Sequence, residues 1–179
     1  MFVRFFQILS QTTVPQNENK MLYFFVVLFV VAADQASKAL IMQSFSPYES
    51  RPVIDGLFNL VYVSNSGAAF SFLANAGAWR HWFFIAIAAL AIVGFTAGWW
   101  VSARHKRLLT VAMALIVGGA IGNLIDRLRF GAVVDFLDVL IGSYHWPAFN
   151  VADSCISVGA TLYVVAAILA DRRQKGGKI

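Results

Sequence analysis

The stretch LLTVAMALIVGGAIGNLI, from Leu108 to Ile125, contains no charged side chain. At about 1.5 Å per residue, a helix of this length can cross most of a hydrocarbon core that is roughly 30 Å thick. Further segments are similarly apolar: Met21 to Ile41, Trp82 to Val101, and Ser154 to Ala170. The sequence therefore predicts an all-α membrane protein with four transmembrane helices.

The composition indicates one small membrane-embedded unit. The chain has 179 residues, of which 59% are hydrophobic and only 13% are charged. It is too apolar for an ordinary soluble domain and too short for several domains. We expect residues 1–20 to form an N-terminal extension, residues 21–170 a single four-helix domain, and residues 171–179 a basic cytoplasmic tail.

The first apolar segment resembles a cleavable secretory signal in one respect. A basic residue, Lys20, precedes it, and an apolar run ends at Ala33. The helical pattern nevertheless continues through Lys38 to Ile41, which is typical of a retained membrane anchor.

Basic residues indicate the orientation. They fill the connection between the second and third apolar segments and follow the fourth: Arg104, Lys106, Arg107, Arg172, Arg173, Lys175 and Lys178. By the positive-inside rule both regions are cytoplasmic, so an even number of spans places both termini there. The excess of 14 Lys and Arg over 9 Asp and Glu is then explained by anionic membrane lipids, without a nucleic-acid partner.

The segment from Met42 to His81 faces the extracytoplasmic side in this arrangement. Its sequence VIDGLFNLVYV, from Val53 to Val63, is rich in β-branched and aromatic residues and predicts a strand or hairpin. The turn sequence NSG, from Asn65 to Gly67, ends the strand. We expect a small extracytoplasmic β platform on the membrane surface, between the first and second helices.

Two acidic residues lie between the third and fourth helices, in VVDFLDVLIGSYHWPAFNVADS, from Val133 to Ser154. Asp135 and Asp153 have apolar neighbours in sequence, where an ionised carboxylate is costly. A loop that returns to the same membrane face can bring them together, so that they share a proton and act as base and acid in peptide-bond hydrolysis. The alternatives are a solvated acid or N-cap for Asp135 and an N-cap of the fourth helix for Asp153.

The motif GGAIGNLIDR, from Gly118 to Arg127, ends the third apolar segment. Its glycines allow close helix approach, and Asn123 and Arg127, four residues apart, share one helix face. An amide and a guanidinium in this position can hold the backbone carbonyls of a substrate. In the alternative, Arg127 pairs with Asp126 or extends to lipid headgroups.

The motif DQASK places Asp34 and Lys38 on one face of the first helix, near its outer end. A mutually paired charge couple is the simplest interpretation of this spacing.

Metal and cysteine chemistry are weaker hypotheses. His145 with Asp135 and Asp153 lacks the ligand spacing of a zinc site. Cys155 is the only cysteine, which excludes an intrachain disulfide and a cysteine-based metal cluster. With His145 as its base, Cys155 lacks the third group that a nucleophilic mechanism needs. The sequence predicts neither a metal nor a cofactor.

Taken together, five motifs in this order resemble the bacterial lipoprotein signal peptidases (signal peptidase II): DQASK, NSGAAF, GGAIGNLIDR, VVDF and FNVAD. The resemblance implies an aspartic endopeptidase of the bacterial inner membrane with its active site at the extracytoplasmic face. Such an enzyme removes the signal peptide from diacylglyceryl-modified prolipoproteins by cleaving on the N-terminal side of the lipidated cysteine. The resemblance also implies inhibition by globomycin-type cyclic peptides.

The resemblance assigns roles to individual residues. It implies that Asp135 and Asp153 are the catalytic pair and that Asp126 falls outside it. It also implies that the following residues hold the substrate: Asn65, Gly67, Asn123, Arg127, Asn150, Asp34 and Lys38.

Two other functions are alternatives. In a small transporter or channel, Asp34, Lys38, Asp126 and Arg127 line a polar path, but the sequence has no broken span and no inverted repeat. A non-catalytic membrane scaffold leaves the clustering of polar residues at one face without an explanation.

Overall fold

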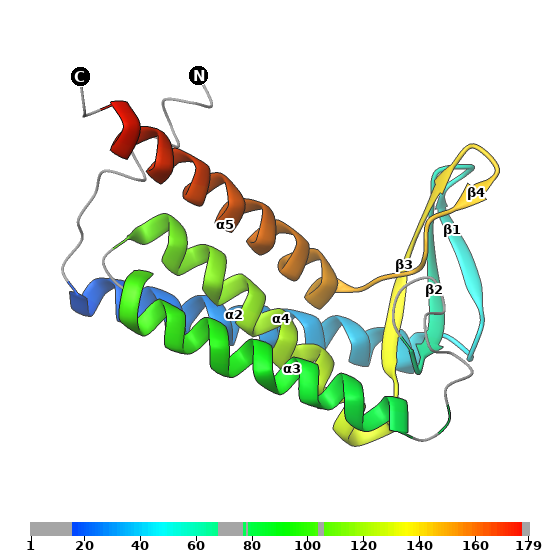
Figure 1. Ribbon diagram of the computed structural model, residues 1–179. Helices are drawn as coiled ribbons and strands as arrows, with labels where there is room; N and C mark the ends of the chain where they lie inside the picture. The colour runs from blue at the N-terminus through cyan, green and yellow to red at the C-terminus, as the bar shows by residue number, and fades with distance from the viewer. Residues whose placement is uncertain (1–15, 68–76, 78, 104–105, 177–179) are drawn as a thin grey trace.

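The computed structural model describes residues 16–67, 77, 79–103 and 106–176 of the chain (Figure 1). In chain order, its elements are α2 (Gln16–Ser44), β1 (Ser50–Ile54), β2 (Phe58–Asn65), α3 (Trp79–Gly98), the π-helical turn η2 (Trp99–Ala103), α4 (Arg107–Phe130), β3 (Val133–Ile141), β4 (Tyr144–His145) and α5 (Val151–Gly176).

The four predicted membrane helices are confirmed. Within the described residues, α2, α3, α4 and α5 are each long and apolar enough to cross a membrane. The helices extend beyond the predicted apolar stretches, because Gln, Glu, Lys and Arg at their ends are good helix formers. Thus α2 already begins at Gln16 and α5 continues to Gly176, so parts of the expected extension and of the expected tail are helical.

Helix α4 lies at the centre of the bundle (Figure 1). Its apolar stretch is 67% buried inside the molecule, compared with 22% or less in the other three helices. Glycines allow its neighbours to approach closely. A Cβ on Gly118 would lie 2.8 Å from Cβ of Val30 in α2, and one on Gly119 would lie 2.5 Å from the carbonyl oxygen of Ala152 in α5. The close helix approach predicted from the glycines is therefore confirmed.

A four-stranded antiparallel sheet with the order β1-β2-β3-β4 lies at one end of the helices (Figure 1). The hairpin of β1 and β2 confirms the strand or hairpin predicted from Val53 to Val63. The sheet also contains β3 and β4, which follow α4, so it extends beyond the segment predicted for it. β3 shows no alternation of apolar and polar residues because its first half is buried on both faces.

Gly131 connects α4 to β3. Its φ of 73° lies in the left-handed region that favours glycine, and its backbone N–H donates to the carbonyl oxygen of Arg127, which ends the helix. β3 then pairs with β2 in a register that places Val133 opposite Asn65. The turn therefore brings Asp135 close to the ends of both α4 and β2.

A buried apolar cluster fixes the sheet on α2. It contains Ile41 near the end of α2 and Val134 and Phe136 of β3, with the half-buried rings of Phe45 and Tyr62 packed against it. Burial of this apolar surface holds the strands in a defined position relative to the helices.

Gly119→Ala is expected to separate α4 from α5. The added methyl group cannot be accommodated 2.5 Å from the carbonyl oxygen of Ala152, so the helices have to shift, at a cost of about 1–3 kcal/mol. The apparent Tm of the purified protein in detergent should fall. Gly94→Ala in α3 is the matched control, because a Cβ there meets no atom within 4 Å. Equal changes of Tm in the two variants would contradict the tight α4–α5 contact.

Candidate active site

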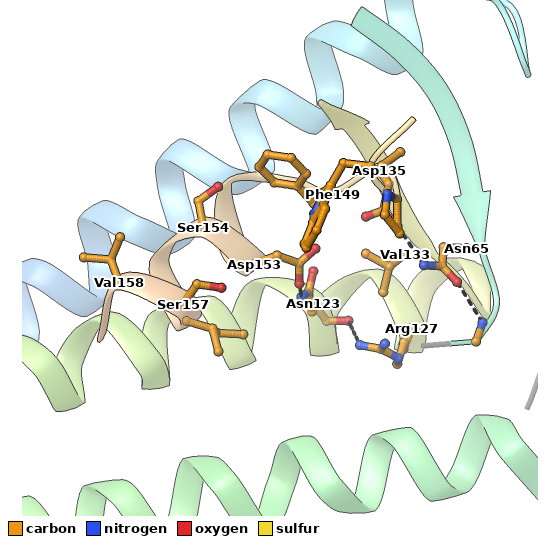
Figure 2. Close-up of a pocket in the computed structure, with 15 residues that line it drawn as sticks. Asn65, Asn123, Arg127, Val133, Asp135, Phe149, Asp153, Ser154, Ser157 and Val158 are labelled. Atoms are coloured by element: carbon orange, nitrogen blue, oxygen red, sulfur yellow. Dashed lines mark hydrogen bonds between the residues drawn. The ribbon is translucent and has the colours of Figure 1, made fainter. Parts of the chain in front are cut away.

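A cavity of about 570 Å³ lies where β2, β3 and the start of α5 meet α4 (Figure 2). Most of the residues predicted for the site line it: Asn65, Gly67, Asn123, Arg127, Asp135 and Asp153. The segment from Trp146 to Phe149 forms another part of the wall. The structure thus brings the two acids, from a strand and a helix that are separate in sequence, to one cavity.

Asp135 lies on β3 and is only 3% exposed, which excludes the solvated surface acid. Its carboxyl oxygens accept hydrogen bonds from Nδ2 of Asn65 at 2.9 Å and Nδ2 of Asn150 at 2.7 Å. Burial, with a smaller contribution from the charge of Asp153, raises the pKa of Asp135 to about 7, although both amide donors act in the opposite direction. Asp135 therefore exchanges its proton near neutral pH.

Asp153 lies in the first turn of α5 and faces the same cavity (Figure 2). Its Oδ1 accepts a hydrogen bond from Nδ2 of Asn123 at 2.8 Å. The N-cap of α5 is Asn150, whose Oδ1 accepts the backbone N–H of Asp153 at 2.9 Å. The alternative in which Asp153 caps this helix is therefore wrong, and its carboxyl group belongs to the cavity.

Three asparagine side chains around the two acids have a fixed orientation. The oxygen of each accepts a hydrogen bond from a group that can only donate: Lys38 Nζ for Asn123, the backbone N–H of Asp153 for Asn150, and the backbone N–H of Gly67 for Asn65. The nitrogen of each amide then points to a carboxyl group. These N–H donors compensate the burial of the two acids.

Behind the cavity, Lys38 is enclosed in a buried ion cluster. Its Nζ lies 2.8 Å from Oδ2 of Asp34, 2.8 Å from Oδ2 of Asp126 and 3.0 Å from Oδ1 of Asn123. The three charged side chains are at most 1% exposed. The charge couple predicted from DQASK is confirmed. Asp34, Lys38 and the fully buried Asn150 do not line the cavity, which differs from the substrate contact expected of them.

The ion cluster connects four elements. Oδ1 of Asp34 accepts the backbone N–H of Ala152 in α5 at 2.9 Å, and Oδ2 of Asp126 accepts the backbone N–H of Val134 in β3 at 3.1 Å. Gln35, which the sequence analysis did not single out, donates to Oδ1 of Asp126 at 2.9 Å. Because these charged side chains are buried and bound to one another, they do not form the polar path that a transporter requires.

Arg127 lines the cavity. The oxygens of Asp126 are bound by Lys38 and Gln35, so the alternative in which Arg127 pairs with Asp126 is not the arrangement observed. Its guanidinium donates to the carbonyl oxygen of Asn123 at 3.4 Å and lies over the ring of Phe84 at 5.2 Å. Asn123 and Arg127 share one face of α4, as their spacing predicts. A positive charge therefore borders the cavity that both carboxyl groups line.

The other candidates from the sequence lie away from the two acids. Nδ1 of His145 contacts Asp138 at 2.9 Å, and Asn59 donates to the same carboxylate at 2.8 Å. Cys155 does not line the cavity. Among the residues that the structure describes, no group of three His, Cys, Asp or Glu is placed to hold a metal. Of the motif NSGAAF, residues 68–70 lie outside the described part of the chain.

An apolar groove of about 420 Å³ joins the cavity between α3, α4 and α5. Apolar side chains line most of it, including Phe84, Ala88 and Ala120. Asn123, Arg127 and Asp153 border both the groove and the cavity. Asp153 therefore lies where the cavity meets an apolar groove among the membrane helices.

Two carboxyl groups that line one cavity, placed at the end of four membrane-spanning helices, form an arrangement that suits a membrane-embedded hydrolase. A solved structure described as a bacterial membrane enzyme has the same fold, with a TM-score of 0.76 and 32% sequence identity over 86% of this chain and 91% of that chain.

The profile of the family described as "Signal peptidase (SPase) II" matches residues 26–169. Two similar relatives are named lipoprotein signal peptidase. One, from Cupriavidus taiwanensis, is 51% identical over 83% of this chain and 84% of its own length, and one from Geobacter sulfurreducens is 49% identical over 83% and 92%. The chain belongs to the signal peptidase II family, whose members are proteases that cleave signal peptides from prolipoproteins. It is a multi-pass membrane protease.

The raised pKa of Asp135 predicts a pH dependence of stability. Because the pKa is about 7 in the folded protein and 3.8 in its ordinary state, the folded protein binds this proton more tightly. The free energy of unfolding should therefore fall as the pH rises from about 4 to about 7 and then level off. The apparent Tm in detergent across this range measures the effect.

Asp135→Asn removes this titration, so the decline of Tm with pH should become smaller. Asp55→Asn, which removes an exposed carboxyl group from the turn between β1 and β2, is the matched control and should retain the parental decline. A decline of the same size in Asp135→Asn would show that another group causes it.

Proposed function

We propose that Asp135 and Asp153 are the catalytic pair of this peptidase. The substrate is a prolipoprotein that carries a diacylglyceryl group on its cysteine, and the bond that is cleaved lies on the N-terminal side of this cysteine. The observation that carries the proposal is that both carboxyl groups line one cavity, each with an amide donor of fixed orientation.

The mechanism requires one proton shared by the two acids. The ionised carboxylate removes a proton from a water molecule as the water oxygen attacks the scissile carbonyl, and the protonated carboxyl group gives its proton to the carbonyl oxygen. The tetrahedral intermediate then collapses, the C–N bond breaks, and a proton passes from the pair to the leaving amine. The pKa of about 7 for Asp135 supports a shared proton at neutral pH.

The polar side chains at the cavity hold the substrate in this proposal. Arg127 and the amide of Asn65 border the carboxyl pair and bind backbone carbonyls of an extended peptide, whereas the amide of Asn123 donates to Asp153. The groove lined by Ala88 and Ala120 takes the small residues that precede the lipidated cysteine. Asp34 and Lys38 support the cavity from behind rather than contacting the substrate.

The membrane places the reaction at an interface. The diacylglyceryl chains remain in the lipid, so the scissile bond is presented at the depth where α4 ends and α5 begins. Lys106 and Arg107 lie at the opposite end of α4, which supports a cytoplasmic location for both termini and an extracytoplasmic location for the cavity, in the bacterial inner membrane. The sheet then forms the extracytoplasmic platform of a single domain over residues 21–170, and globomycin-type cyclic peptides inhibit by occupying the cavity.

Asp135→Asn and Asp153→Asn should each lower the rate of cleavage by at least about 10³-fold, because an amide cannot serve as base or acid. The measurement is gel-shift cleavage of a purified diacylglyceryl-modified prolipoprotein, with and without globomycin. Asp138→Asn is the matched control: Asp138 lies on the same strand but binds Asn59 and His145 away from the cavity.

We expect Asp138→Asn to retain turnover within a few-fold of the parental rate. All three variants should insert and keep a cooperative unfolding transition. Parental turnover in either Asp135→Asn or Asp153→Asn would remove that residue from the catalytic pair.

Treatment of the purified enzyme with an excess of EDTA should leave the rate of cleavage unchanged, since the proposed mechanism uses only carboxyl groups and water. The same gel-shift assay measures the rate before and after chelation. A loss of turnover that added zinc restores would favour a metal-dependent mechanism instead.

A further inference from the structure

We propose that Lys38 is a positioning residue for the peptidase reaction, which holds the amide of Asn123 in the orientation that donates an N–H to Asp153. This inference rests on the proposed role of the carboxyl pair. Lys38 does not line the cavity, so it acts through Asn123 and not on the substrate.

The ammonium group of Lys38 uses its three hydrogens on three acceptors. Two are the carboxylates of Asp34 and Asp126, each at 2.8 Å, and the third is Oδ1 of Asn123 at 3.0 Å. The two carboxylates hold the charge in a protein interior where an unpaired ammonium is costly. The third contact joins this ion cluster to the cavity.

The contact decides which end of the Asn123 side chain faces the acid. An ammonium can only donate, so the amide oxygen turns towards Lys38 and the nitrogen towards Oδ1 of Asp153. Nδ2 of Asn150 also approaches the oxygen of Asn123 at 3.2 Å. That nitrogen has two hydrogens and three acceptors within 3.3 Å, so Lys38 is the stronger constraint.

The orientation matters for the shared proton. While Asn123 donates to Oδ1 of Asp153, this oxygen is an acceptor, and the proton is available for exchange at the other oxygens of the pair. If the amide turned over, its oxygen would face Asp153 and draw the proton onto Oδ1, in a hydrogen bond that the reaction does not use. Loss of Lys38 should therefore reduce the chemical step and leave substrate binding largely unchanged.

The charged groups near the pair determine the pH profile as well. The charges that act on Asp135 are Lys38 on α2 and Asp153 on α5, and Arg127 on α4 also interacts with it. Asp126 on α4 binds the backbone N–H of the neighbouring Val134. The positive charge of Lys38 lowers the pKa of Asp135, in opposition to the larger effect of burial. Removal of Lys38 should move the pH profile of kcat to higher pH, a change that a purely structural role would not produce.

A double-mutant cycle tests the inference. Lys38→Met alone leaves Asp34 and Asp126 buried without their partner, so the cycle uses Asp126→Asn as its common background. The four chains are this background, the background with Lys38→Met, the background with Asn123→Ala, and the background with both substitutions. For each chain, kcat and KM are measured on a diacylglyceryl-modified prolipoprotein, and the apparent Tm confirms folding.

We expect Lys38→Met to lower kcat by about tenfold or more while KM stays within about twofold. In the chain that already carries Asn123→Ala, the same substitution should lower kcat by less than about twofold, because the amide through which Lys38 acts is missing. Losses that multiply independently, or a loss confined to KM, would overturn the inference and leave the catalytic assignment of Asp135 and Asp153 untouched.

A second variant tests the inference if the chains of the double-mutant cycle do not fold. Asn123→Asp in the otherwise parental chain keeps an oxygen for Lys38 but removes the N–H that faces Asp153. It should lower kcat by a similar factor with KM nearly unchanged. Parental kcat in Asn123→Asp would overturn the inference, whereas failure of the parental chain to cleave the substrate would count against the proposed function itself.

Discussion

The site depends on one constraint: a carboxyl group removed from water needs N–H donors, and an amide side chain supplies one reliably only when its oxygen is already occupied. Asn65, Asn123 and Asn150 each meet this condition through a partner that cannot accept. Their nitrogens therefore face Asp135 and Asp153, because the reversed orientation would place each nitrogen against another donor. Asp135 stays buried and Asp153 half-buried at one cavity because the amides supply N–H donors in place of water.

The amides are in turn held by the way α4 contacts its neighbours. Gly118 and Gly122 on one side of α4 admit α2, and Gly119 on another side admits α5. The ion cluster around Lys38 and the N-terminus of α5 therefore both come within hydrogen-bond distance of Asn123. Larger residues would keep these helices apart by more than a hydrogen bond can span. The contacts that pack the helices together thus also hold the side chains of the cavity in place.

The sequence predicted the four membrane helices because apolar length is a local property, and it predicted the first hairpin because β-branched and aromatic residues are concentrated there. It did not predict β3, since this strand is buried on both faces and carries two acids, which removes the period-two pattern. The two acids were selected from local surroundings and resemblance, but the N-cap role expected as the alternative for Asp153 belongs to Asn150. Gln35 had no signal of its own because its role depends on Asp126, which lies 91 positions further along the chain.

The hydrogen bond from Ala152 to Asp34 joins residues 118 positions apart, so α2 and α5 meet at the site. During synthesis, a chain that has produced only three spans already contains Lys38, Asn123 and Asp135 but not the start of α5. Such a nascent chain has half of the carboxyl pair and an incomplete cavity. In the proposed mechanism, proteolytic competence therefore arises only after α5 has been synthesised and has entered the bilayer.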